Sequence, residues 1–104
     1  MDEEYIIQGL VDLIFKAETQ LPLDVISALE KAEKIETGIA KIQLQTMIKN
    51  AKIASETKRP ICQDTGVQTF FITVGEDFQY VGKLKSLIKK AVKIATKNIP
   101  LRPN

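Results

Sequence analysis

Residues 67–74 read VQTFFITV and carry the strongest strand signal of the chain. The stretch is rich in β-branched and aromatic residues, and a glycine follows it, which together favour a β-strand. Its two alternating faces both carry apolar side chains, as is typical of a strand in a sheet that is covered on both sides. We therefore expect one central β-strand or small sheet here.

The residues on either side of this stretch follow helical patterns. Pro22 suits the first turn of a helix, where its missing N–H costs nothing, and Thr37 suits an N-cap position. Apolar residues recurring at three- and four-residue steps predict about four helices, over residues 3–17, 22–34, 37–57 and 81–95. The expected fold class is therefore α+β, mostly α, as a fragment of a larger catalytic domain.

Length and composition indicate one domain, residues 1–104, with 44% hydrophobic residues. The apolar runs are far shorter than the roughly 18 residues that a membrane span needs. The acidic start MDEEY lacks the basic flank and apolar segment of a signal peptide, so we expect a cytoplasmic protein without a membrane partner. A single cysteine also excludes a disulfide within the chain.

The net charge is only +2, but the C-terminal part is strongly basic. After Asp77 the chain holds six lysines and one arginine and no acidic residue. Such a stretch could attract nucleic acid or another anionic partner. It lacks the aromatic and arginine content of nucleic-acid surfaces, so we expect a solvated helix face and no nucleic-acid partner. A non-catalytic helical interaction domain that uses this helix stays open.

Residues 59–66 read RPICQDTG and suit neither a helix nor a strand. Pro60 disfavours the helical conformation in the residue before it and so helps to end the third helix. The resulting loop presents a soft metal ligand, an amide, a carboxylate and a hydroxyl: Cys62, Gln63, Asp64 and Thr65. Loops held between rigid elements often carry sites. The alternative is a small buried cysteine beside a polar turn.

Several kinds of site are excluded by the residues that the chain lacks. It has no histidine to activate a cysteine nucleophile, and one cysteine cannot build a zinc site that needs about four ligands. Its five glycines have neither the spacing of a phosphate loop nor that of a dinucleotide-binding turn. What remains is a thiolate that contributes one ligand to a centre completed elsewhere.

Residues 60–66, PICQDTG, resemble the PxCQDTG signature of class I fumarate hydratases and the related L-tartrate dehydratases, which are iron–sulfur hydro-lyases. The surrounding chain agrees with this resemblance. The Asn50-Ala51 step, the stretch after the motif and the closing LRPN are similar to the beginning of the alpha subunit or N-terminal domain of that family. The resemblance covers the whole chain but well under half of a family subunit.

This resemblance implies a lyase that reversibly hydrates fumarate to L-malate, a step of the tricarboxylic acid cycle, or alternatively one that dehydrates L-tartrate. It implies a four-iron four-sulfur cluster held by three cysteines, of which only Cys62 is present. Gln63 and Asp64 would bind the dicarboxylic acid substrate, and Asp64 would also act as the catalytic acid or base. A beta subunit or C-terminal domain and a homo-oligomer are implied as well, so we expect the isolated chain to be inactive.

Overall fold

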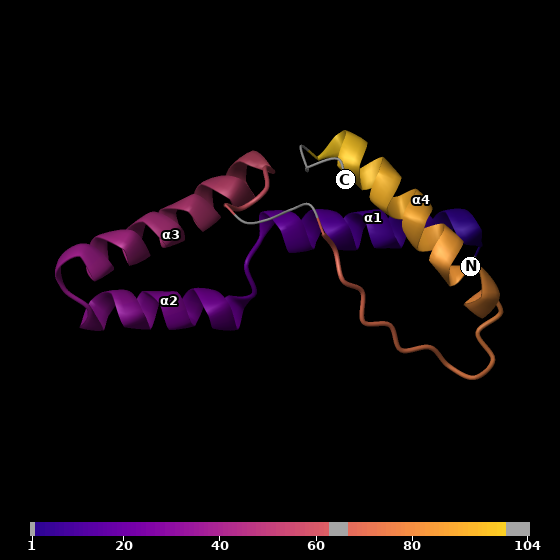
Figure 1. Ribbon diagram of the computed structural model, residues 1–104, viewed down its shortest axis with the longest axis horizontal. Coiled ribbons are helices and arrows are strands. Elements are labelled where there is room, and N and C mark those ends of the chain that lie inside the picture. The colour runs from indigo at the N-terminus through magenta and orange to yellow at the C-terminus, as the bar shows by residue number, and fades with distance from the viewer. Residues whose placement is uncertain (1, 63–66, 100–104) are drawn as a thin grey trace. The chain divides into compact units, whose positions relative to one another are not determined.

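The computed structural model describes residues 2–62 and 67–99 of the chain. The described part contains four α-helices and one short 3-10 helix (Figure 1): α1 Glu3–Thr19, α2 Leu23–Ile35, α3 Gly38–Thr57, η1 Val81–Lys83 and α4 Leu84–Asn98. The helices lie close to where the apolar periodicity predicted them. The chain divides into two compact units, Ala17–Gln63 and Met1–Lys16 with Asp64–Asn104. None of the described helices combines the length and apolarity needed to cross a bilayer.

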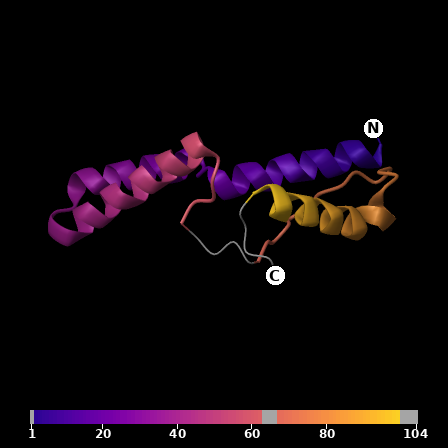
Figure 2. The same cartoon turned by 90° about the horizontal axis from the view of Figure 1, so that it is seen from above.

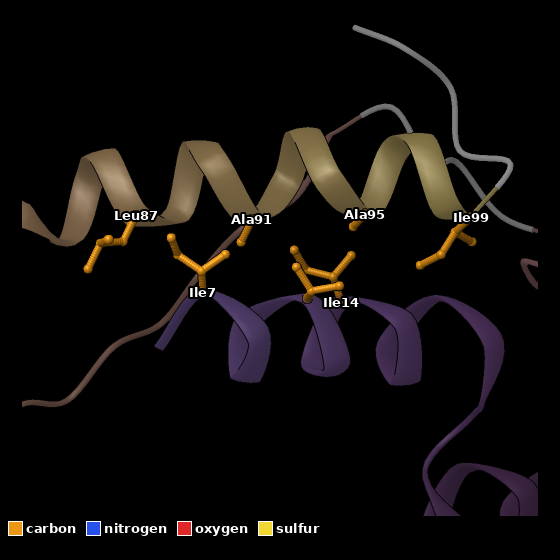
Figure 3. Packing of buried hydrophobic residues seen from close by; sticks show 7 residues of the cluster. Ile7, Ile14, Leu87, Ala91, Ala95 and Ile99 are labelled. Carbon is orange, nitrogen blue, oxygen red and sulfur yellow. The ribbon is translucent and has the colours of Figure 1, made fainter. Parts of the chain in front are cut away.

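The unit that contains most of α1 is built on the pairing of α1 with α4, which lie side by side in both views (Figures 1 and 2). Ala91 and Ala95 are fully buried, and their small side chains let the two helices approach closely. Phe70 packs against this core from outside the helices. Figure 3 shows the core, whose buried members are Ile7, Val11, Ile14, Leu87, Ala91, Ala95 and Ile99.

Polar contacts reinforce the ends of this unit. The Asp2 carboxylate accepts a hydrogen bond from the backbone N–H of Tyr5 at 2.9 Å and so caps α1. Lys83 Nζ lies 2.8 Å from Glu3 Oε1, and this hydrogen-bonded ion pair lowers the pKa of Glu3 and raises that of Lys83. The lysines of α4 are all exposed, on the side of the helix away from its buried stripe.

The other unit contains the antiparallel pair α2 and α3. Gly38, with φ of 63°, occupies the left-handed conformation that glycine adopts without strain, and it begins α3. Thr37 occupies the N-cap position as predicted, but its side chain makes no capping hydrogen bond. Gln45 donates a hydrogen bond to Glu33 Oε1 at 2.9 Å, which lowers the pKa of that carboxyl. Lys41 Nζ also lies 3.5 Å from Glu33 Oε1, so polar pairs join the two helices.

The prediction of a central β-strand or small sheet, and with it the α+β fold class, was wrong. The described residues are helical or irregular and contain no strand, and residues 67–74 follow an irregular path. A strand is stabilised by hydrogen bonds to a neighbouring strand, and the described chain offers no partner. The expectation of cover on both faces also fails, because Phe71 is 95% exposed while its neighbour Phe70 is partly buried.

Candidate functional site

The segment that leads to the candidate ligand Cys62 begins where α3 ends. Lys58 takes the left-handed conformation, with φ of 55°, and caps the helix. The backbone N–H of Arg59 then bonds to the carbonyl oxygen of Ala54 at 3.0 Å. Pro60 follows, and the chain leaves the helical path. The predicted end of the third helix before residues 59–66 is therefore confirmed.

Ile61 anchors this segment against the rest of its unit. Its side chain is only 8% exposed. Its backbone N–H donates a hydrogen bond to the carbonyl oxygen of Glu18 at 2.8 Å. One apolar side chain and one backbone hydrogen bond thus fix the position of the residue directly before Cys62.

Cys62 itself is exposed and carries a free thiol. Its backbone N–H donates a hydrogen bond to Oδ1 of Asn50, on α3, at 2.9 Å. The backbone of the residue is therefore held while its side chain is open to solvent. This arrangement differs from the alternative of a small cysteine buried in the interior, because an exposed thiol is accessible to a metal centre outside the unit.

A groove of about 450 Å³ lies beside Cys62 in the same unit. Among the residues that the structure describes, apolar side chains dominate its lining and none is charged: Leu21, Val25, Leu29, Thr46, Met47, Asn50, Ile61 and Cys62. A dicarboxylate would lose its hydration in such a groove without gaining a charged partner. The described lining of the groove is thus poorly suited to the carboxylate groups of the predicted substrate.

Cationic side chains flank the segment on its N-terminal side. Lys58 and Arg59 are both exposed and lie four and three residues, respectively, before Cys62 in the chain. Exposed cations near a site raise the local concentration of anionic ligands. They give this part of the chain a charge that suits an anionic substrate.

The other predicted site residues lie outside the described part of the structure. Gln63 and Asp64 belong to residues 63–66, so their predicted roles in substrate binding and catalysis stay predictions. Thr65 and Gly66, the last residues of the predicted loop, lie outside the described residues for the same reason.

The donor set of the chain fits part of an iron–sulfur site. Among the described residues, no three His, Cys, Asp or Glu side chains lie together as a metal site would need. The whole sequence contains one cysteine and no histidine. A cluster of the predicted type is held mainly by cysteine thiolates. The exposed thiol of Cys62 fits one such ligand, and the chain cannot supply a complete set.

The contact between Asn50 and Cys62 was missed by the sequence analysis, which used Asn50 only as part of the family resemblance. Asn50 lies three residues after Met47 and four before Ala54, and it therefore falls on the apolar side of α3. An amide on that side of a helix needs a hydrogen-bond partner. This position was the signal that could have found the contact.

Comparison with known proteins identifies the family. A family model described as fumarate hydratase (Fumerase) matches residues 7–104. A protein of Methanocaldococcus jannaschii, provisionally named L(+)-tartrate dehydratase subunit alpha, is 45% identical over 98 residues, which cover 91% of this chain. The L(+)-tartrate dehydratase subunit alpha of Escherichia coli K12 is 42% identical over 87 residues, which cover 83% of this chain.

The Shigella sonnei protein of the same name is likewise 42% identical over 87 residues. These matches take in only part of each relative. The chain spans 34% of the length of the M. jannaschii protein and 29% of the length of the E. coli and S. sonnei proteins. Because the family model matches nearly the whole sequence from residue 7 onward, this chain belongs to the fumarate hydratase family.

Proposed function

We propose that residues 1–104 act as a single N-terminal segment of a hydro-lyase alpha subunit, and that this segment contributes a ligand to a four-iron four-sulfur cluster. The reaction is the reversible hydration of fumarate to L-malate. The observation that carries this proposal is the family match over residues 7–104, which includes the whole PICQDTG motif. The exposed thiol of Cys62, on a backbone held by hydrogen bonds, supports its role as a ligand.

Each residue of the motif has a separate task in this proposal. Cys62 supplies one thiolate, and the remaining cysteine ligands come from outside this chain. The cluster, when bound, supplies an open iron that acts as a Lewis acid toward the hydroxyl and carboxylate oxygens of the substrate. Gln63 donates a hydrogen bond from its amide to a substrate carboxylate. Asp64 transfers the proton that accompanies addition or removal of water.

The complete enzyme requires further protein. We propose a beta subunit or C-terminal domain that supplies additional substrate-binding and acid–base groups, and a homo-oligomeric assembly in the cytoplasm. The names of the curated relatives support the beta subunit, because each is called an alpha subunit. In the fumarate case the reaction belongs to the tricarboxylic acid cycle.

L-Tartrate dehydration is the second candidate. The observation that favours it is that the three relatives described above, at 42–45% identity, are named as tartrate dehydratase subunits. Both reactions move water across a carbon–carbon bond of a four-carbon dicarboxylic acid. They therefore make the same demands on Cys62 and Asp64 and differ in how the substrate hydroxyl groups are recognised.

An assay of the complete enzyme, loaded with iron and sulfide under anaerobic conditions, separates these candidates. Turnover of fumarate and malate above that of L-tartrate supports the first proposal, and the reverse order supports the second. The 104-residue chain alone serves as a control and is expected to be inactive, because it has one cysteine for a three-cysteine site. A complete, cluster-loaded enzyme that turns over none of these acids would overturn both reactions, and a complete protein that binds no cluster would favour the helical interaction domain.

A further inference from the structure

The side chain of Asn50 is bonded unlike those of Thr46, Thr57 and Gln45, three other polar residues of α3. The hydroxyls of Thr46 and Thr57 donate to the carbonyl four residues back in the same helix, at 3.0 and 2.7 Å. Gln45 donates to a carboxylate on the neighbouring helix α2. Asn50 instead accepts the hydrogen bond of the Cys62 backbone N–H, across 12 residues of sequence. A side chain of α3 therefore holds the backbone of the candidate cluster ligand itself.

This bond completes a series of contacts that fix the path from α3 to Cys62. The backbone N–H of Arg59 donates a hydrogen bond to the carbonyl oxygen of Ala54, and the backbone N–H of Ile61 donates one to the carbonyl oxygen of Glu18. Of these three hydrogen bonds, only the one at Cys62 has a side-chain acceptor. A substitution of Asn50 can therefore remove it and leave the backbone donors and acceptors of the other two bonds unchanged.

We propose that Asn50 is a positioning residue for Cys62, because it holds the ligand backbone in place before the cluster binds. The inference rests on the assignment of Cys62 as a cluster ligand under the proposed function. Groups that orient a metal ligand without touching the metal commonly affect how well the metal is held. The bond between Asn50 and Cys62 is exposed to solvent, so its effect is that of an ordinary hydrogen bond, roughly 2- to 10-fold in an opening equilibrium.

Amide hydrogen exchange at Cys62 in the full 104-residue chain tests the bond directly. Asn50→Leu keeps a similar side-chain volume but removes the acceptor, and Asn50→Asp keeps an acceptor oxygen. Gln43→Leu makes the matching change at an exposed position of the same helix. We expect Asn50→Leu to speed exchange at Cys62 roughly 2- to 10-fold, with Asn50→Asp and Gln43→Leu close to the parent.

Exchange at the Ile61 amide is the internal standard, because its partner is a backbone carbonyl. The inference is supported if Asn50→Leu speeds exchange, relative to the parent, more at Cys62 than at Ile61, and if Asn50→Asp leaves exchange at Cys62 close to the parental rate. Unchanged exchange at Cys62 overturns it. Equal acceleration at Cys62, at Ile61 and along α3 also overturns it, because Asn50 would then support the unit as a whole.

A second measurement links the bond to the cluster. In the complete enzyme, the rate at which the cluster absorbance decays in the presence of an iron chelator is compared between the parent, Asn50→Leu and Gln43→Leu. We expect decay to be roughly 2- to 10-fold faster in Asn50→Leu alone. Decay at the parental rate in Asn50→Leu, while Cys62→Ser loses the cluster, overturns the positioning role. Retention of the cluster by Cys62→Ser refutes the proposed function instead.

Discussion

The backbone N–H of Ile61 lies 2.8 Å from the carbonyl oxygen of Glu18 and donates a hydrogen bond to it. The side chain of Ile61 is buried at the same place. The residue before the candidate ligand Cys62 is therefore fixed to the rest of its unit by two independent contacts. Stability of the unit and placement of the ligand are coupled through Ile61.

Truncation of this side chain measures how strongly the segment is held. Ile61→Ala removes a buried side chain, and we expect the free energy of unfolding to fall by about 2 kcal/mol or more. Ile35→Ala is the matched control, because Ile35 is 79% exposed and its truncation should cost less than about 0.5 kcal/mol. Urea unfolding of the two variants gives the comparison. Equal losses would mean that Ile61 is not an anchor.

The close approach of α1 and α4 depends on alanine at position 91. Ala91 is fully buried between the two helices, so Ala91→Leu must displace them or adopt a strained rotamer. We expect a loss of about 1–3 kcal/mol in the free energy of unfolding. Ser86→Leu introduces the same side chain at an exposed position of α4 and should change stability by less than about 0.5 kcal/mol. If chemical denaturation finds Ala91→Leu as stable as the parent, α4 does not pack as described.

The ion pair between Glu3 and Lys83 makes stability depend on pH. The pKa of Glu3 is lowered below its ordinary value of 4.5 by the hydrogen bond from Lys83. This contribution is fully present above pH 4.5 and is lost as the pH falls through the lowered pKa. The raised pKa of Lys83 keeps the pair intact up to at least pH 10.5, and the contribution is lost as the pH rises through that pKa.

Lys83→Met should therefore lower the melting temperature slightly at pH 7 and low salt, and the difference from the parent should disappear in acid. Lys93→Met, an exposed position on α4, is the control for loss of a positive charge. A difference from the parent that persists at a pH well below 4.5 would show that the effect of Lys83 does not come from the carboxylate of Glu3.

The four helices could be predicted because their signal is local. Apolar residues at helical spacing and the proline after Arg59 give the bounds of α3 almost without tertiary information. Residues 67–74 carry an equally clear strand composition, yet a strand depends on a partner that local sequence does not contain. The composition of VQTFFITV therefore led to the wrong fold class.

The candidate site, too, could be predicted from the sequence only in part. Cys62 could be found from the motif, because a seven-residue pattern is written directly in the sequence. Its contact with Asn50 depends on the direction in which the chain leaves α3, which the left-handed conformation of Lys58 sets. No sequence pattern requires that conformation of a lysine.

Asp64 and Cys62 should respond differently to substitution in the complete enzyme. Asp64→Asn keeps the size of the side chain but removes its capacity to exchange a proton, so turnover per cluster should fall about 10²- to 10⁴-fold with the cluster intact. Cluster absorbance and turnover with fumarate, malate and L-tartrate are measured on the same samples. Turnover within about threefold of the parent at full occupancy would refute the acid–base role. Loss of the cluster would show instead that Asp64 supports the ligand loop.

Iron content of Cys62→Ser in the complete enzyme tests the ligand assignment most directly. Serine is a harder and less readily ionised ligand than cysteine, so the variant should lose most of its iron, and turnover should fall in proportion. Ser55 is exposed in the same unit, and the control variant Ser55→Ala should keep the iron content and the turnover of the parent. A Cys62→Ser enzyme with the iron content and turnover of the parent would contradict the account, because Cys62 would then be an exposed thiol without a part in the cluster.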